Sequence, residues 1–128
     1  VRQEDRPDRK VYHITDAGRQ ELIQWLVAQP PMGEPRNAPL VQVFFLGQLT
    51  DEEALAKFEN FADIMRMMLV QYEQVPPKID EIHHHVGSDR ERFFWNLTLE
   101  NGIRNMQANL EWAESVIERI KAGQVPEK

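Results

Sequence analysis

The sequence has 128 residues, with 15 lysines and arginines against 21 aspartates and glutamates, a formal net charge of −6 and no cysteine. This length suits one domain with a modest core, and no apolar run approaches the roughly 18 residues that cross a bilayer, which excludes a membrane protein. The lack of cysteine excludes disulfides and thiolate metal sites, and together with the lack of a leader-like start it favours the cytoplasm.

Charge is distributed unevenly along the chain. Residues 1–19 hold five cationic and four acidic side chains, whereas residues 20–128 hold ten and seventeen. An acidic body repels a phosphate backbone, so any contact with nucleic acid is expected within about the first ten residues.

The first predicted element is a β-hairpin at the start of the chain. The β-prone run VYHIT at residues 11–15 alternates like a strand, and residues 1–4 are expected to end its partner strand. Pro7-Asp8 is typical turn chemistry. The predicted hairpin therefore carries its cationic side chains at or near the tip: Arg2, Arg6, Arg9 and Lys10.

A helix is predicted next, from about Asp16 to Ala28, because Thr15 can cap its first turn and Pro30-Pro31 must end it. Residues 30–39 contain four prolines and one glycine, which indicates a linker and a domain boundary. A short helix over 40–46 follows, with Gly47 as its expected stop.

Thr50 and Glu53 form a capping-box pattern that begins the next helix. Apolar residues then recur at spacings of four and three up to Val75, before Pro76-Pro77. This pattern predicts one wide apolar face, most simply a face of the intramolecular core.

A final helix is predicted from about Asp89 to Lys121, on the order of 50 Å long. Seven apolar residues along it alternate at spacings of four and three, a pattern typical of coiled-coil pairing. We call them the seam. We predict homodimerisation through the seam, although intramolecular packing is the alternative; its members are Leu99, Ile103, Met106, Leu110, Ala113, Ile117 and Ile120.

Catalytic signatures are absent from the sequence, so an enzyme, a metal site or a cofactor is not expected. Consecutive imidazoles rarely bind one ion, and His83-His84-His85 is interpreted as a solvated loop, with a metal or pH-sensing site as the alternative. Aromatic and methionine side chains indicate an effector pocket, with ordinary core packing as the more frequent alternative. The pocket candidates are Trp95, Trp112 and Tyr72, accompanied by Phe93, Phe94, Met65, Met67 and Met68.

The run RPDRKVYHITDAGRQELIQWL resembles the wing and following helix of the winged-helix domain in PadR-like transcriptional regulators. Two further runs, PLVQVFFLGQLTDEEAL and LTLENGIRNMQANLEWAESVIERI, resemble the ends of the family's C-terminal, AphA-like virulence-activator module. Gly102, Leu110 and Trp112 belong to its spacing pattern. The similarity covers nearly the whole chain.

The resemblance implies a mainly α-helical fold: a remnant wing hairpin, then a helical C-terminal dimerisation domain with a long terminal helix. It divides the chain into the end of a winged helix (1–29), a linker (30–39) and a dimerisation and effector-response domain (40–128). The family's recognition helix precedes the wing, so this chain resembles a C-terminal portion. The implied partners are a second copy, double-stranded DNA and a small-molecule effector, as in a dimeric bacterial repressor or activator.

Two functions are compatible with the sequence. The first is the dimerisation and effector-response part of a transcription regulator, whose wing touches phosphates or the minor groove and so positions the protein without specifying a sequence. The alternative is a helical oligomerisation or adaptor module with neither DNA nor ligand. The basic hairpin favours the first, because an adaptor has no use for it.

Overall fold

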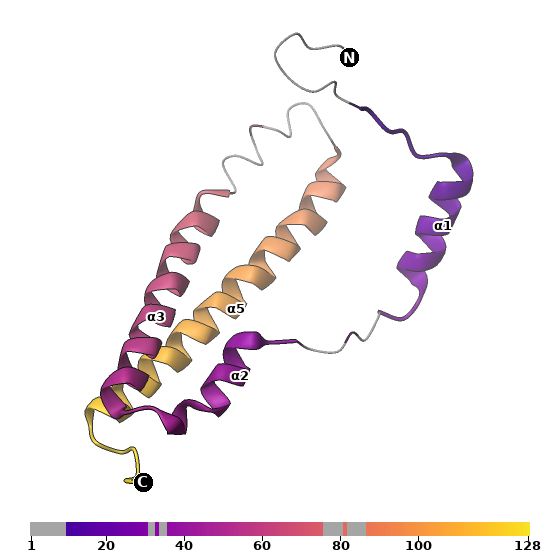
Figure 1. The fold of residues 1–128 in the computed structure, drawn as a ribbon. Coiled ribbons are helices and arrows are strands. Elements are labelled where there is room, and N and C mark those ends of the chain that lie inside the picture. Colours follow the sequence, from indigo (N-terminus) through magenta and orange to yellow (C-terminus); the bar gives the residue numbers. More distant parts are fainter. Residues whose placement is uncertain (1–9, 31–32, 34–35, 76–80, 82–86) are drawn as a thin grey trace. The chain divides into compact units, whose positions relative to one another are not determined.

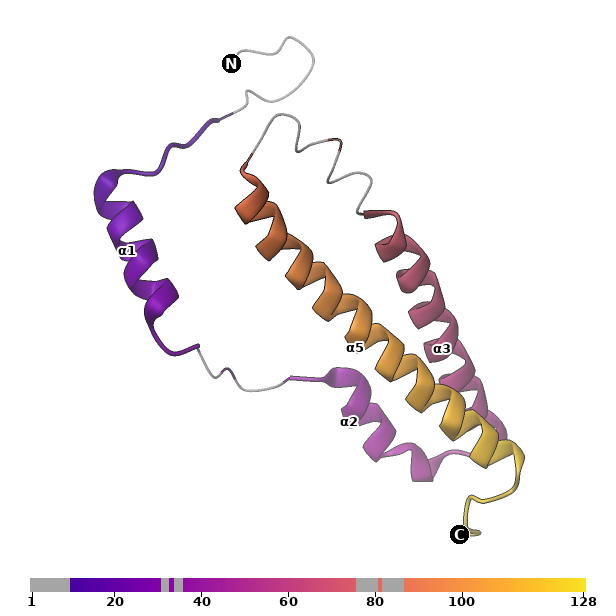
Figure 2. The ribbon, with the colours of Figure 1, turned by 180° about the vertical axis from the view of Figure 1, so that it is seen from behind.

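The computed structural model describes residues 10–30, 33, 36–75, 81 and 87–128. The chain divides into two compact units, Val1–Asn37 and Ala38–Lys128. The predicted mainly helical fold is confirmed, and the helices are shown in Figures 1 and 2. No helix in the described ranges is both long and apolar enough to span a bilayer.

The described part of the first unit is dominated by α1, Asp16–Val27. The hydroxyl oxygen of Thr15 accepts a hydrogen bond from the Gly18 backbone N–H at 3.0 Å, as the N-cap prediction required. No residue of α1 is buried within the chain, and Trp25 and Val27 are 61% and 81% exposed.

The predicted hairpin is not observed. Residues 10–15, the part of it that the structure describes, have no strand structure. The expected partner strand and turn, residues 1–9, lie outside the described residues.

The second unit begins with α2, Ala38–Phe44, and a 3₁₀ turn η1, Leu46–Gln48. The expected helix over 40–46 therefore starts two residues earlier and changes to a tighter turn at its end. Gly47 does not stop it, as it lies within η1 and lacks the positive φ of a helix-ending glycine.

An antiparallel pair of helices forms the body of this unit: α3, Asp51–Glu73, and α5, Asp89–Lys121 (Figures 1 and 2). The predicted bounds of α5 are confirmed, as is the capping box that begins α3. Ser88 and Glu91 form a second capping box at the start of α5, and their spacing of three residues is the same as that of Thr50 and Glu53.

The core lies between α3 and α5. Its buried side chains are Phe58, Ala62 and Met65 from α3 and Ala113 from α5, so Met65 has the core role that was the alternative to an effector pocket. Residues that pack against it from α2, η1, α3 and α5 are Val43, Leu46, Phe61, Leu110, Trp112, Val116, Ile117 and Ile120.

Two ion pairs connect α3 and α5. Arg66 lies 3.0 Å from Glu114, and Lys121 lies 3.3 Å from Glu59. All four side chains are about half exposed, so each pair is expected to contribute less than about 1 kcal/mol. Packing in the core therefore supplies most of the stability of the helical pair.

Two glycines with positive φ bound α5. Gly87, with φ of 88°, precedes the N-cap, and Gly123, with φ of 69°, follows the C-cap. The backbone N–H groups of Gly123 and Gln124 donate to Ile120 O at 3.0 Å and Arg119 O at 3.1 Å, which is a Schellman ending.

Gly87→Ala is expected to lower the free energy of unfolding by about 2 kcal/mol, and Gly123→Ala by about 1 kcal/mol. Both substitutions incur the steric cost of positive φ. At Gly87 the new Cβ would also lie 2.9 Å from Cη2 of Trp95, whereas at Gly123 it would meet nothing within 4 Å. Urea unfolding followed by circular dichroism measures both, and equal losses would contradict the proposed clash with Trp95.

Candidate functional site

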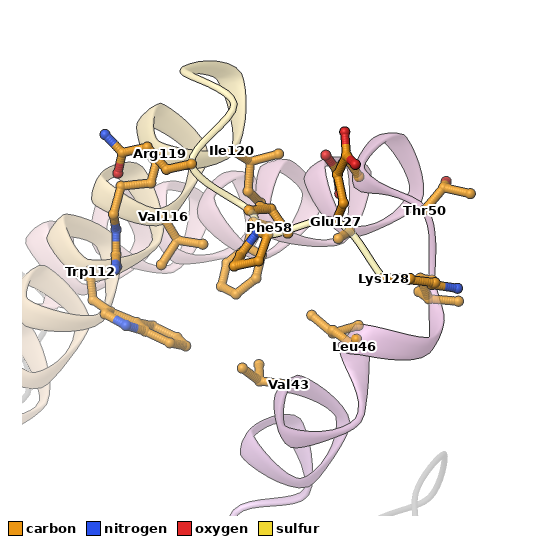
Figure 3. A pocket seen from close by; sticks show the side chains of 17 residues that line it. Val43, Leu46, Thr50, Phe58, Trp112, Val116, Arg119, Ile120, Glu127 and Lys128 are labelled. Carbon is orange, nitrogen blue, oxygen red and sulfur yellow. The ribbon is translucent and has the colours of Figure 1, made fainter.

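A pocket of about 900 Å³ opens in the second unit, where α2 and η1 meet the start of α3 and the end of α5. Figure 3 shows the side chains of Val43 and Leu46 facing Phe58, with Val116 and Ile120 on the other wall. Residues 124–128, which follow the Schellman ending, complete the lining. Hydrocarbon side chains therefore form most of its inner surface.

Trp112 connects the pocket to the core. Its ring packs edge-on against Phe58 at a centroid separation of 5.4 Å and against Phe61 at 6.2 Å. Because these contacts hold the indole in place, one wall of the pocket is formed before any ligand arrives.

Charged groups are found at the rim. Nε of Arg119 donates to the backbone oxygen of Ser115 at 3.4 Å, and Nζ of Lys128 donates to the backbone oxygen of Gln48 at 3.4 Å. Asp51 and Glu127 also line the pocket. None of these four charged side chains forms an ion pair within the described ranges.

The three aromatic residues predicted for an effector pocket do not come together. Trp112 lines the pocket described above, but Trp95 lies 17 positions earlier on α5, roughly 25 Å along the helix. Trp95 lies close to Gly87, and Tyr72 lies 4.0 Å from the position that a Cβ on Gly102 would take. The sequence did not predict Val43, Leu46, Arg119 and Lys128 as pocket residues. No local pattern indicates that α2 and the C-terminal turn lie close together.

The C-terminal half of the seam has an intramolecular partner in α3. Leu110, Ala113, Ile117 and Ile120 belong to the core or pack against it, and Ala113 is 0% exposed. The other three members, Leu99, Ile103 and Met106, are half-buried within the single chain. Intramolecular packing, the alternative to homodimerisation, therefore holds for the C-terminal half of the seam. Contact of the seam with a second subunit stays a prediction.

The predicted DNA-contacting residues are mostly outside the described ranges. Of the four, only Lys10 is described, and it is exposed. Arg2, Arg6 and Arg9 lie outside, as do the three consecutive histidines His83-His84-His85. Within the described residues, no group of three or more His, Cys, Asp or Glu side chains is placed to hold a metal ion.

The second unit is a helical hairpin of α3 and α5 preceded by the short helix α2. The profile of the family described as virulence activator alpha C-term matches residues 35–121. The chain belongs to this family, and the predicted similarity to PadR-like transcriptional regulators is confirmed.

Two curated relatives are transcription regulators. The chain is 23% identical to the negative transcriptional regulator PadR of Bacillus subtilis over 88% of its own length and 63% of that protein's. It is 24% identical to the probable transcriptional regulator Rv1176c of Mycobacterium tuberculosis, over 94% of this chain and 68% of that one. The chain thus spans about 63% of the length of the Bacillus relative.

Solved structures share the fold. The crystal structure of Bacillus subtilis PadR with operator DNA matches with a TM-score of 0.72 and 21% identity, over 94% of this chain and 66% of that one. The complex of the same protein with p-coumaric acid matches with a TM-score of 0.68 and 21% identity, over 83% and 64%. The PadR-like regulator BC1756 of Bacillus cereus gives 0.67 and 17% identity, over 85% and 61%.

Proposed function

We propose that this chain is the C-terminal portion of a PadR-like DNA-binding repressor that pairs two copies and responds to an effector. In this proposal residues 1–29 are the C-terminal part of a winged-helix domain and residues 30–39 are a linker. Residues 40–128 form the domain that dimerises and responds to the effector. The observation that carries it is the family match over residues 35–121, joined to a fold similarity that extends over 94% of the chain. One relative is named a negative regulator, which favours repression over activation.

Homodimerisation is proposed through α5. This helix has 33 residues against 23 in α3, so it is longer by about 15 Å. Lys121 pairs with Glu59 near the start of α3, which places the excess length at the N-terminal end of α5. There Phe93 and Phe94 are 61% and 50% exposed, and exposed apolar side chains that cluster are typical of protein interfaces. The half-buried Leu99, Ile103 and Met106 continue the same helix.

Light scattering over a concentration series is expected to give twice the chain mass, and Phe93→Glu with Phe94→Glu is expected to shift it to the monomer. A buried carboxylate without a partner opposes association, whereas these positions are exposed in the single chain and tolerate charge there. Val70→Glu, at a 56% exposed position on α3, is the matched control and should remain dimeric. A monomeric unmodified chain would contradict dimerisation for residues 1–128.

Contact with DNA is proposed for the basic segment at the start of the chain. Arg6→Ala with Arg9→Ala, in the protein that includes the recognition helix, is expected to weaken binding similarly for all sequences. It should also lower the slope of log affinity against log salt by about one to two, since each lost phosphate contact removes about one released counterion. Titration of labelled duplexes at several salt concentrations measures the slope. An unchanged slope would contradict the assignment of Arg6 and Arg9; Arg2 and Lys10 are proposed for the same contact.

The effector response is proposed as a change in the angle between the two DNA-binding heads of the dimer. A solved relative was crystallised with p-coumaric acid, which supports a small molecule as the signal.

A further inference from the structure

We propose that the pocket between α2, η1, α3 and the end of α5 binds a single-chain aliphatic carboxylate. Its hydrocarbon tail would lie along the apolar floor, and its carboxylate would pair with Arg119. The volume of about 900 Å³ falls within the range of roughly 300 to 1,000 Å³ that is typical of ligand pockets.

The lining favours an acyl chain as the apolar part of the ligand. Val43, Leu46, Val116 and Ile120 present branched hydrocarbon, and Phe58 is held edge-on by Trp112. Methylene groups gain about 0.8 kcal/mol each on burial and need no hydrogen-bond partner.

The charges around the rim favour an anion at one end of the pocket. Figure 3 shows Arg119 and Trp112 at one end, with Thr50 and Lys128 at the other. The guanidinium of Arg119 has five N–H donors, and the structure uses one of them, in a long bond of 3.4 Å to the Ser115 backbone oxygen. A carboxylate fits its remaining donors in a paired geometry.

The acidic lining residues are placed so that they do not cancel this preference. Asp51 follows Thr50, the residue that Figure 3 shows at the end away from Arg119, and it lies in the first turn of α3, where the helix dipole stabilises its charge. Glu127 is followed by Lys128, so the last two residues of the lining carry one acidic and one basic side chain. The Arg119 end of the pocket is therefore its anion-binding end.

Occupancy would also act on α2 and η1. Val43 and Leu46 form one wall, whereas Leu40, Val41 and Phe44 of α2 are exposed. A chain that contacts Val43 and Leu46 on one side and Val116 on the other would hold α2 and η1 against the helical pair. Slower amide hydrogen exchange in residues 38–48 is the expected consequence.

Isothermal titration calorimetry with decanoate and with 1-decanol tests the proposal on the 128-residue chain. Decanoate is expected to bind once per chain, more tightly than 1-decanol, and to slow exchange in residues 38–48. Arg119→Gln should weaken decanoate about ten-fold, the loss of one charge-assisted pair, and leave 1-decanol unchanged. Arg104→Gln, on an exposed arginine of the same helix that pairs with Glu100, is the matched control and should change neither affinity.

Three results would overturn the proposal: no binding of decanoate at about 1 mM, equal affinity for the alcohol, or an Arg119→Gln variant with unchanged decanoate affinity. Val116→Trp, which places an indole on the apolar floor beside Ile120, adds a check on location, because it should change decanoate affinity if the tail lies there. The pocket is formed within one chain, so these results are independent of the dimer and DNA experiments. Circular dichroism of each variant confirms that it is folded before titration.

Discussion

Phe58→Ala is expected to lower the free energy of unfolding of this chain by about 3 to 4 kcal/mol. Phe58 is 6% exposed and belongs to the buried core between α3 and α5, so its replacement removes apolar contacts and leaves unfilled space there. Its edge-on contact with Trp112 at 5.4 Å would be lost as well. A loss of this size is a large fraction of the stability of a typical domain.

Phe45→Ala is the matched control for that measurement. Phe45 also takes part in an edge-on aromatic pair, with Phe44 at 5.1 Å, but it is 62% exposed. Its replacement is expected to cost less than about 1 kcal/mol. Urea unfolding of both variants by circular dichroism makes the comparison, and similar losses would show that burial between α3 and α5 does not control stability.

Ala113→Leu is expected to lower the free energy of unfolding by about 1 to 3 kcal/mol through overpacking. Ala113 and Ala62 are both 0% exposed, at the place where α3 and α5 pack against each other. Three additional carbon atoms have no space there unless the helices move apart. Helix propensity does not explain the loss, because leucine is nearly as favourable as alanine in a helix.

Ala108→Leu is the control for Ala113→Leu, since Ala108 is on the same helix and exposed. It should leave stability within about 0.5 kcal/mol of the unmodified chain. The pair of variants also tests how the seam is used. If Ala113 faced a second subunit instead of α3, Ala113→Leu would change the mass measured by light scattering before it changed unfolding of the single chain.

Element bounds were largely predictable because their signals are local. Thr15 and Thr50 cap helices through hydrogen bonds that span three residues, and such contacts depend only on neighbouring sequence. The bounds of α5 followed from its uninterrupted spacing of apolar residues. The prediction of a strand at residues 11–15 was wrong. A strand depends on pairing with another segment, and the five residues of the run do not encode that pairing.

The sequence by itself determined that this chain is helical, where α1, α3 and α5 lie, and which family it resembles. Only the tertiary structure decided that Ala113 and Ile117 face α3 of their own chain, because a repeat of apolar residues specifies a contact face without specifying the partner. Only the tertiary structure placed Val43 beside Val116 and Arg119 at the rim of one pocket. Residues more than 70 positions apart meet through the packing of whole helices, and no local pattern encodes that meeting.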